Sequence, residues 1–328
     1  MADPAAPILQ PRDGAPLVEA GVRAPLIVID DFLVPALAEA MRADIERHFA
    51  EPHDHRPETH QVWNYWFVPG LHTYLRTAPE KVIAQNRVAQ FFDALKAWSI
   101  LSLGLAGVTW PFLSLYVAGC REALHNDPGN GRFGFVYSLT RDERRTIGGE
   151  TLVMREGDLF RSNLARPAAG QSFHEAVAPR FNRLIVFDDR LPHAVNPLEG
   201  SLDPVEGRLV LHGHLSEAET IVTGALPPAV AAKPLAVSLA EFAVHAAARI
   251  ALYRGVLGLR LVIDRSGRVA QCIVLVDRVV HADGGDVEWE PLRQGLIEQL
   301  SGLKFPRASG ETLVALPIVF GEPLSGLG

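Results

Sequence analysis

Two histidines, one aspartate and one arginine carry the strongest chemical signal in this sequence. His125 and Asp127 form a His-x-Asp triplet, His193 lies further along the chain, and Arg208 follows it. Two imidazoles and a carboxylate can bind a ferrous ion on one face, which leaves its other positions open. A guanidinium can bind the carboxylate of an acidic co-substrate through two parallel hydrogen bonds. We therefore predict a metal site at His125, Asp127 and His193, with an anion site at Arg208.

A His-x-Asp triplet is weak evidence by itself in a chain of 328 residues with 12 histidines. The sequence contains a second copy with the same spacing, His281-Ala282-Asp283. Two glycines and another acid follow this copy, which is typical of a solvated loop. The surroundings of the first copy must therefore distinguish the two.

The surroundings of His125 and His193 predict buried strands. An apolar, β-branched and aromatic run at 112–117 precedes the first triplet, and Gly119 can turn the chain between them. A second such run, 133–139, follows a turn-rich segment, and a third, 183–187, precedes His193. Because a rigid scaffold can aim side chains at strand ends into a cavity, we expect the three ligands to meet there.

The segment from Arg208 to Leu215 alternates between two faces, as a strand does. One face carries Arg208, Val210, His212 and His214. If this face looks into a barrel, Arg208 is buried and needs an anion. Arg183 is the alternative residue for this role, but it precedes the strand that leads to His193, so Arg208 is favoured.

These motifs, in this order, resemble the iron(II)- and 2-oxoglutarate-dependent dioxygenases of the prolyl 4-hydroxylase type. The resemblance covers about residues 26–215. One departure is the 14-residue segment between His193 and Arg208, which is longer than the family pattern and rich in Pro and Gly, as in a hairpin loop. The matching pieces are the strand-to-helix opening at 27–33, Tyr116 and Gly119, His125-x-Asp127, Val136-Tyr137-Ser138-Leu139, Gly148-Gly149-Glu150-Thr151, Leu184-Ile185-Val186-Phe187, His193-Ala194-Val195 and Arg208.

The resemblance implies a mainly β fold with helices: a double-stranded β-helix (jelly-roll or cupin-like) barrel that N-terminal helices brace. It also implies that His125, Asp127 and His193 hold Fe(II), and that Arg208 binds the distal carboxylate of 2-oxoglutarate. Three hydroxyl groups are further candidates for contact with this co-substrate, although each could equally be a buried core hydroxyl. They belong to Tyr116, Ser138 and Thr151.

The implied activity is oxidation of an unactivated C–H bond with Fe(II), 2-oxoglutarate and O2, and with ascorbate as an optional addition. Succinate and CO2 are the implied by-products. A peptide or protein side chain is the favoured substrate, since proline is the family's commonest target. A free amino acid or a natural product is one alternative, and a non-catalytic binding or assembly module is another. The intact ligand set speaks against the non-catalytic alternative.

The spacing of apolar residues predicts two helices before the metal ligands. Apolar residues recur every fourth position from Leu37 to Phe49, after Pro35, and form a second stripe from Val88 to Trp98. We expect both helices to brace the barrel.

The segment between these helices has little periodicity. Its histidines could form a second metal site, but a solvated loop is the favoured interpretation; they are His53, His55 and His60. Its aromatic part is expected to form a lid or substrate wall near the metal, with plain packing as the alternative. The candidate substrate-binding residues are Trp63, Tyr65 and Trp66.

Composition is consistent with a globular protein of two domains. The sequence contains no apolar run near 18 residues and no signal-like N-terminus, so we expect a cytoplasmic protein without membrane association. Two cysteines make a disulfide framework improbable. The formal net charge of −7 argues against broad nucleic-acid binding.

The character of the sequence changes after residue 218. We predict an N-terminal tail at 1–25, a dioxygenase domain at 26–218, a Pro-rich linker at 219–236 and a small α+β domain at 237–328. In this last domain a helix is expected from Leu239 to Tyr253, followed by two strands, a helix and a strand. The turn Asp264-Arg265-Ser266-Gly267 and the closing strand resemble the C-terminal domain of TonB-like proteins. This likeness implies a partner-binding or dimerising role, in which an open strand edge accepts a peptide.

Overall fold

The computed structural model describes residues 26–50, 62–127, 129–143, 145–155, 173–217, 219–282 and 289–321. The chain divides into two compact units. The barrel unit comprises Pro25–Leu95 and Val108–Leu215, and the C-terminal unit includes Lys96–Gly107 and Ser216–Gly328. The predicted tail at 1–25 and the histidines His53, His55 and His60 lie outside the described residues.

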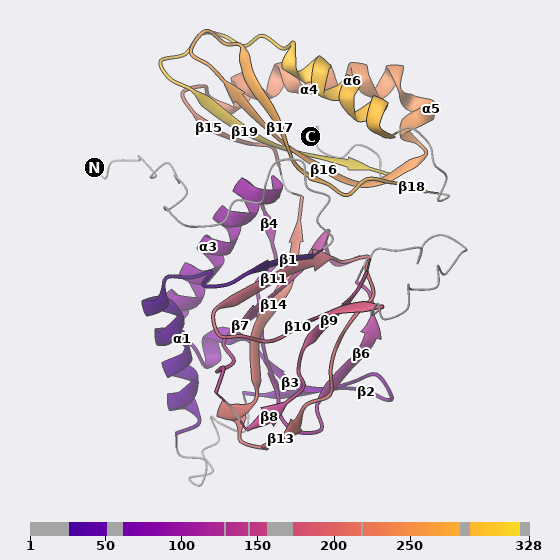
Figure 1. Ribbon diagram of the computed structural model, residues 1–328. Coiled ribbons are helices and arrows are strands. Elements are labelled where there is room, and N and C mark those ends of the chain that lie inside the picture. The colour runs from indigo at the N-terminus through magenta and orange to yellow at the C-terminus, as the bar shows by residue number, and fades with distance from the viewer. Residues whose placement is uncertain are drawn as a thin grey trace. The chain divides into compact units, whose positions relative to one another are not determined.

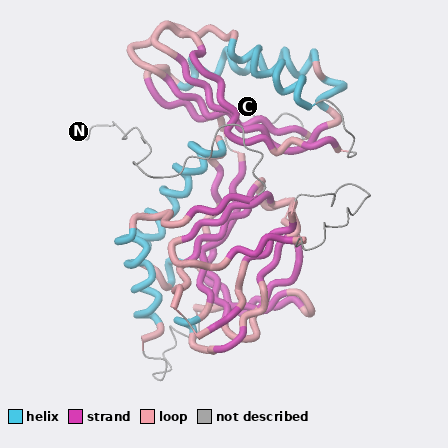
Figure 2. Tube along the Cα trace, viewed as in Figure 1, coloured by secondary structure: helices cyan, strands magenta, loops and turns pink. Residues whose placement is uncertain are grey.

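A curled antiparallel sheet of twelve strands forms the barrel unit (Figures 1 and 2). The strand order along the main path is β1-β11-β7-β14-β5-β3-β6-β12-β9-β10, while β2 pairs with β3 and β4 with β14. The mainly β barrel predicted from the sequence is therefore confirmed. The strands are β1 (Leu26–Ile29), β2 (Asn64–Val68), β3 (His72–Thr77), β4 (Gly107–Val108), β5 (Phe112–Tyr116), β6 (Arg121–His125), β7 (Phe133–Ser138), β9 (Thr151–Met154), β10 (His174–Val177), β11 (Arg183–Asp188), β12 (His193–Val195) and β14 (Arg208–Ser216).

Short elements close the ends of the barrel strands. Strands β8 (Thr146–Ile147) and β13 (Glu199–Gly200) pair with each other, and two 3-10 turns lie at Pro79–Lys81 and Pro204–Glu206. The second turn lies in the long segment between His193 and Arg208. That segment is thus partly ordered by local hydrogen bonds, such as the one that the backbone N–H of Val205 donates to Asp203.

Helices α1 (Pro35–His48) and α3 (Gln85–Leu103) brace the barrel, as predicted (Figure 1). Pro35 occupies the first turn of α1, where a missing N–H costs nothing. The predicted apolar stripes are buried: Met41 and Ile45 of α1 are inaccessible to solvent. From α3, the ring of Phe91 packs at 4.9 Å from that of Tyr137 in β7. These contacts tie the helices to the central strands.

The C-terminal unit is a second sheet with helices packed on one face (Figures 1 and 2). Its core combines apolar residues of the sheet with Leu292, Leu296 and Leu300 from α6. The predicted small α+β domain is confirmed in its class. The strand order is β15-β19-β16-β17, with β18 on β16. The elements are β15 (Ile221–Gly224), α4 (Pro228–His245), α5 (Ala247–Ile250), β16 (Tyr253–Ile263), β17 (Val269–Asp277), β18 (Val280–His281), α6 (Trp289–Ser301) and β19 (Thr312–Phe320).

The predicted linker at 219–236 is structured instead. It contains β15 and the beginning of α4, which starts at Pro228 and ends at His245. Pro227 precedes the helix and Pro228 is its first residue, a position where proline suits the helical backbone. The predicted helix from Leu239 to Tyr253 is thus shifted, because Tyr253 already begins β16.

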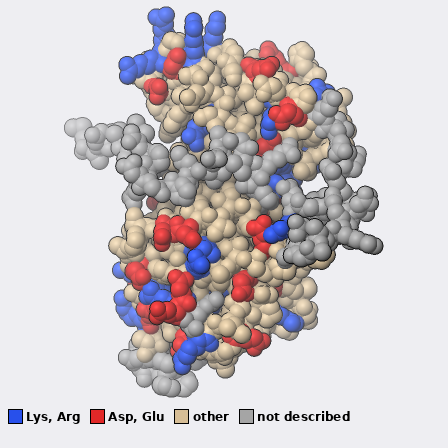
Figure 3. Space-filling model, in the orientation of Figure 1, with Lys and Arg blue, Asp and Glu red and all other residues tan. Residues whose placement is uncertain are grey.

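No described helix is long and apolar enough to cross a membrane. On the face of the barrel unit shown in Figure 3, acidic and basic side chains are intermingled. Arg141 of the barrel unit forms ion pairs with both Glu39 and Glu46.

Candidate metal centre

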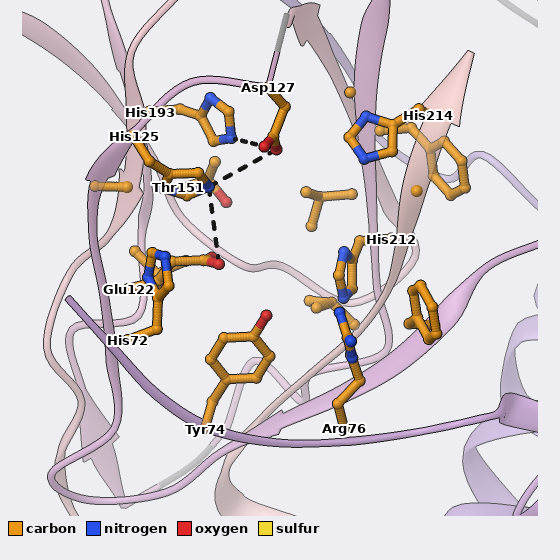
Figure 4. A pocket seen from close by; sticks show the side chains of 18 of the residues that line it. His72, Tyr74, Arg76, Glu122, His125, Asp127, Thr151, His193, His212 and His214 are labelled. Atoms are coloured by element: carbon orange, nitrogen blue, oxygen red, sulfur yellow. Dashed lines mark ion pairs between the residues drawn. The ribbon is translucent and has the colours of Figure 1, made fainter. Parts of the chain in front are cut away.

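His125 and His193 lie side by side because strands β6 and β12 pair antiparallel in the register that places these two residues opposite each other. Their ring centroids are 4.3 Å apart. Two imidazoles from sequence-distant segments thereby face one point (Figure 4).

Asp127 completes the predicted triplet. Its backbone N–H donates to the carbonyl of Asp189 at 2.9 Å, which holds the chain beyond the end of β6. Its Oδ2 lies 3.6 Å from Nε2 of His193 and 3.8 Å from Nε2 of His125. The three potential ligand atoms all lie within 4.8 Å of one another. This spacing suits an ion that binds its ligands at roughly 2.0–2.2 Å.

Backbone carbonyls set which ring nitrogen of each histidine can bind a metal. Nδ1 of His125 donates to the carbonyl of Ala123 at 2.8 Å, and Nδ1 of His193 donates to that of Leu191 at 3.0 Å. A carbonyl can only accept, so the proton of the neutral ring is held on Nδ1. Nε2 of each ring therefore presents its lone pair to the shared space, as in protein metal sites.

The charges of this triplet are coupled. The hydrogen bond from His193 lowers the pKa of Asp127, against the opposing effect of burial. Burial tends to lower the pKa of His193, but hydrogen bonds to Asp127 and to the carbonyl of Leu191 outweigh it, so that its pKa is raised. The metal-free site thus binds a proton where a cation would otherwise sit, and a metal must displace it.

Arg208 lies in the same cavity and is almost fully buried. Its Nη2 donates to Oγ1 of Thr151 at 3.1 Å. Its Nε is buried with no hydrogen-bond partner among the described residues. A buried charged donor without an acceptor is costly, so the site is suited to an anion.

The Gly-Gly pair predicted from the family pattern makes room for this arginine. At Gly149, whose φ is +76°, an added Cβ would lie 2.6 Å from Leu198 and 3.2 Å from Cδ of Arg208. At Gly148, with φ +83°, a Cβ would lie 2.0 Å from the carbonyl oxygen of Pro197. Both positions therefore require glycine, for conformation and for space.

Arg183, the alternative anion-binding residue, has an acid of its own. Its Nε and Nη2 donate to the two carboxylate oxygens of Asp30 at 2.5 and 2.8 Å. It also donates to the carbonyl of Ala178. Arg183 does not line the cavity. The structure thus separates the two arginines, one saturated by its own chain and one not.

The other predicted site residues divide into those at the cavity and those away from it. Tyr116, Thr151 and Trp66 line it. Ser138 is buried elsewhere, and its Oγ accepts from the backbone N–H of Thr140. Trp63 and Tyr65 also lie away from the cavity. Nε1 of Trp63 donates to His48, and its ring stacks on Phe49, while Tyr65 is 63% exposed and stacks on Phe67.

The cavity measures about 480 Å³ and contains several polar side chains that the sequence did not single out as site residues. His72, Tyr74 and Arg76 point into it from alternate positions of β3 (Figure 4). Their i, i+2, i+4 spacing in His72-Thr73-Tyr74-Leu75-Arg76-Thr77 is the signal that could have found them. The predicted face of β14 is also at the cavity: Arg208, Val210, His212 and His214 all line it.

Glu122 is a second carboxylate beside the triplet. Its Oε1 lies 3.8 Å from Nε2 of His125, and its Oε2 accepts from the hydroxyl of Tyr116 at 3.2 Å. With His72 and His125 it forms another group whose ligand atoms lie within 4.8 Å of one another. His125 thus belongs to two candidate ligand sets, of which the one with Asp127 and His193 is the more buried.

The opposite wall carries two more histidines, each with a polar partner. His212 shares a hydrogen bond of 2.8 Å with the hydroxyl of Ser114. Burial, and then the positive charges of Arg76 and Arg208, lowers the pKa of His212 to about 3, so its ring is neutral. Nδ1 of His214 lies 3.0 Å from Oδ2 of Asp189, and burial raises the pKa of that aspartate.

The second His-x-Asp copy lies apart from this site. His281 belongs to the two-residue strand β18 of the C-terminal unit, and its ring meets Tyr253 edge-on at 5.7 Å. Asp283 lies outside the described residues.

Comparison with known proteins gives similar solved structures but no match by sequence. No protein-family model matches the chain, and no curated protein is similar to it. A prolyl-4-hydroxylase from Pseudomonas putida is 19% identical, with a TM-score of 0.42, covering 59% of this chain and 93% of that one. A Trichoplax adhaerens prolyl hydroxylase, in complex with a hypoxia inducible factor peptide fragment, is 15% identical, with a TM-score of 0.40 and coverage of 57% and 81%.

A third similar structure is the non-heme alpha ketoglutarate dependent epimerase SnoN from nogalamycin biosynthesis. It is 16% identical, with a TM-score of 0.41, and the match covers 60% of this chain and 80% of that one.

Proposed function

We propose that the barrel unit is an iron(II)- and 2-oxoglutarate-dependent dioxygenase. One observation carries this proposal: the His125, Asp127 and His193 triplet lines a single cavity with Arg208, whose buried Nε has no hydrogen-bond partner among the described residues. Three ligands alone would fit many metals. The buried guanidinium of Arg208 beside these ligands, with its Nε–H still available to donate, favours an organic acid as a second ligand of the site.

The donor set fits ferrous iron. Two neutral imidazole nitrogens and one carboxylate on one face of an octahedral ion leave positions open for other ligands. Bound iron, together with 2-oxoglutarate and O2, would supply the oxidation of a C–H bond with release of succinate and CO2.

The chain's own residues bind and orient the acid. Arg208 and Thr151 would hold the distal carboxylate, since Nε of Arg208 has no partner in the described part of the chain and Thr151 fixes the position of Nη2. Tyr116 lies flat beneath the guanidinium, with its ring centroid 4.7 Å from Cζ of Arg208. Apolar side chains such as Val136, Phe187 and Val210 line the remaining wall and help to exclude water.

A peptide or protein side chain is the substrate that we favour, with a free amino acid or natural product as the alternative. Two of the aromatic side chains that line the cavity are also exposed to solvent: Trp66 is 40% and Phe112 43% exposed. Aromatic rings that belong both to a cavity and to the surface suit a substrate longer than the cavity itself.

Anaerobic titration of the full chain with ferrous iron and 2-oxoglutarate tests this function. A metal-to-ligand absorption band, followed by succinate formation when O2 is admitted, is the expected result. Absence of both the band and succinate would favour the non-catalytic alternative. A triple variant, His125→Ala with Asp127→Ala and His193→Ala, is the control that must lose the band.

For the C-terminal unit we propose a partner-binding or dimerising role. Both metal-capable clusters found among the described residues lie in the barrel unit. Strands β15 and β17 end the second sheet, and each has one edge that no other described strand pairs with. Light scattering on the full chain tests the dimerising role. A measured mass equal to that of the monomer would exclude dimerisation.

A further inference from the structure

We propose that Arg76 forms a second anion site in the cavity and that the substrate carries a carboxylate which this site binds. The inference deepens the proposed function and rests on it. It concerns the substrate rather than the co-substrate.

Arg76 is placed by the middle strand of three. Strand β3 pairs with β2 on one side and β5 on the other, where Arg76 lies opposite Asn64 and Ser114. Its side chain lines the cavity. Figure 4 shows it beside His212, away from His125 and His193.

Two aromatic rings hold the guanidinium. Its Cζ lies 3.9 Å from the ring centroid of Trp66, which β2 contributes, and 4.2 Å from that of Phe112, which β5 contributes. Rings from both flanking strands restrict the guanidinium without using its N–H donors, because a cation–π contact engages the flat face of the group. The donors on its edge stay available in a fixed direction, which lowers the entropy cost of binding an anion.

Arg76 has no acid of its own in the described part of the chain, where no hydrogen bond or ion pair of its side chain is found. Other arginines differ in this respect: Arg183 binds Asp30, Arg141 binds Glu39, and Arg293 binds Asp277. Arg76 thus carries its positive charge into the cavity without a counter-charge from the residues that the structure describes.

The acids that line the cavity already have other partners. Glu122 accepts from Tyr116, Asp127 lies with His193, and Asp189 lies with His214. The histidine beside Arg76, His212, is bonded to the hydroxyl of Ser114 and contributes no negative charge. The carboxylates that line the cavity are thus each engaged by another side chain, and none of them is bonded to Arg76.

The co-substrate leaves Arg76 unused. A dicarboxylate such as 2-oxoglutarate has one carboxylate for the metal and one for Arg208, which is nearly fully buried against Tyr116 and Thr151. Arg76 is less buried and lies against Trp66 and Phe112, two cavity-lining residues that are themselves exposed to solvent. A substrate that enters there would meet Arg76, and a carboxylate matches its planar fork.

Benzoate and benzamide serve as binding probes, since they share shape but differ in charge. Each is titrated by calorimetry into the anaerobic iron-loaded full chain with saturating 2-oxoglutarate, which occupies Arg208. We expect benzoate to bind at least about 10-fold more tightly than benzamide, as one charge-assisted pair allows. Equal binding, or no benzoate binding, overturns the proposal.

Three variants assign this preference to the residue. Arg76→Gln is expected to abolish it, Arg76→Lys to keep part of it, and Arg121→Gln, which changes an exposed arginine of β6, to leave it unchanged. A preference that survives in Arg76→Gln overturns the proposal. Circular dichroism and the absorption band with 2-oxoglutarate check that each variant is folded and loaded. If Arg76→Gln fails this check, Arg76→Lys decides, because it must bind benzoate more weakly than the unchanged protein does.

Two substrate sets distinguish the sources of the carboxylate. N-acetyl amino acids present a free α-carboxylate, as a small acid would, whereas N-acetyl amino acid methylamides carry charge only on Asp and Glu side chains, as a peptide would. Stimulation of succinate release by acids of either set supports the proposal. The set that stimulates shows whether the carboxylate belongs to a small acid or to an acidic side chain of a peptide. Equal stimulation by neutral members overturns it.

Failure of the proposed function has a different signature. It removes the absorption band and the heat of 2-oxoglutarate binding in the unchanged protein. The benzoate preference is then measured with Arg208→Gln in place of saturating 2-oxoglutarate. In that case the benzoate preference of the Arg76 variants alone decides whether Arg76 forms an anion site.

Discussion

The guanidinium carbon of Arg208 lies 4.7 Å from the ring centroid of Tyr116, its direct partner across strands β14 and β5. The Tyr116 hydroxyl is directed elsewhere and donates to Glu122. The ring therefore supports the arginine through its face, while its hydroxyl links the anion site to the metal-facing wall. Burial is the main cause that raises the pKa of Tyr116, so the hydroxyl stays protonated as a donor.

Arg208→Gln is expected to weaken 2-oxoglutarate binding by about 30- to 100-fold, because it removes a charge-assisted pair from a buried site. Metal binding should be unchanged, since Arg208 touches none of the three ligands. The dissociation constant of 2-oxoglutarate, read from the absorption band, checks the first part. The 2-oxoglutarate affinity of Arg208→Lys should lie between those of the unchanged protein and Arg208→Gln. Equal affinity in all three proteins would contradict the assignment of Arg208 to 2-oxoglutarate binding.

Asp127→Ala is expected to abolish metal-induced stabilisation while leaving the metal-free fold intact. It removes one ligand and no core volume, as Asp127 lies beyond the end of β6 and is partly exposed. A ligand that binds only the folded state raises the melting temperature, so Mn²⁺ should raise that of the unchanged protein but not that of the variant. Asp93→Asn, on an exposed position of α3, is the matched control. An equal rise with Mn²⁺ in the Asp127 variant would remove this residue from the ligand set.

Arg183→Gln is expected to lower the free energy of unfolding by about 1–2 kcal/mol, because it breaks the paired hydrogen bonds to Asp30. These bonds join the segment after β1 to β11, and the affinity for 2-oxoglutarate should stay the same. Urea denaturation and co-substrate titration measure the two effects. A weakened affinity for 2-oxoglutarate with an unchanged free energy of unfolding would indicate that Arg183, and not Arg208, binds 2-oxoglutarate.

His212 is expected to make the protein less stable as the pH falls from 6.5 towards 3. Its pKa in the folded protein is about 3, against 6.5 for the free side chain. Between these values the unfolded chain binds a proton that the folded chain does not, so acidification favours unfolding. His212→Gln should therefore show a shallower loss of unfolding free energy between pH 7 and pH 5 in urea denaturation. Identical slopes in the two proteins would mean that His212 is not held neutral.

The grouping of His125, Asp127, His193 and Arg208 around one cavity could be predicted because the sequence signals of these residues are local. Each histidine follows a recognisable strand, and the alternation from Arg208 to His214 put a whole face of β14 at the cavity, as found. Arg76 was missed because the pattern of its own strand is weak. Strand β3 is short and mixes His, Tyr and Arg with Thr, so it lacks the apolar alternation that marks a half-buried strand.

The predicted linker illustrates a second kind of error. Prolines at 227, 228 and 234 suggested a spacer, but a proline at the first position of a helix loses no hydrogen bond, and α4 begins there. Its buried residues Ala231, Leu235 and Ser238 show that packing on the second sheet, which local propensity does not report, decides the outcome.

The order of residue types along this chain was enough to determine which functional groups are available at the strand ends: two imidazoles, a carboxylate and a guanidinium. Only the tertiary structure decided which charges are free to act. Asp30 and Arg183 are 153 residues apart and neutralise each other, whereas Arg76 contacts two aromatic rings and has no acidic partner within the described ranges. Such pairing depends on the register of strands that are distant in sequence, and no local pattern encodes it.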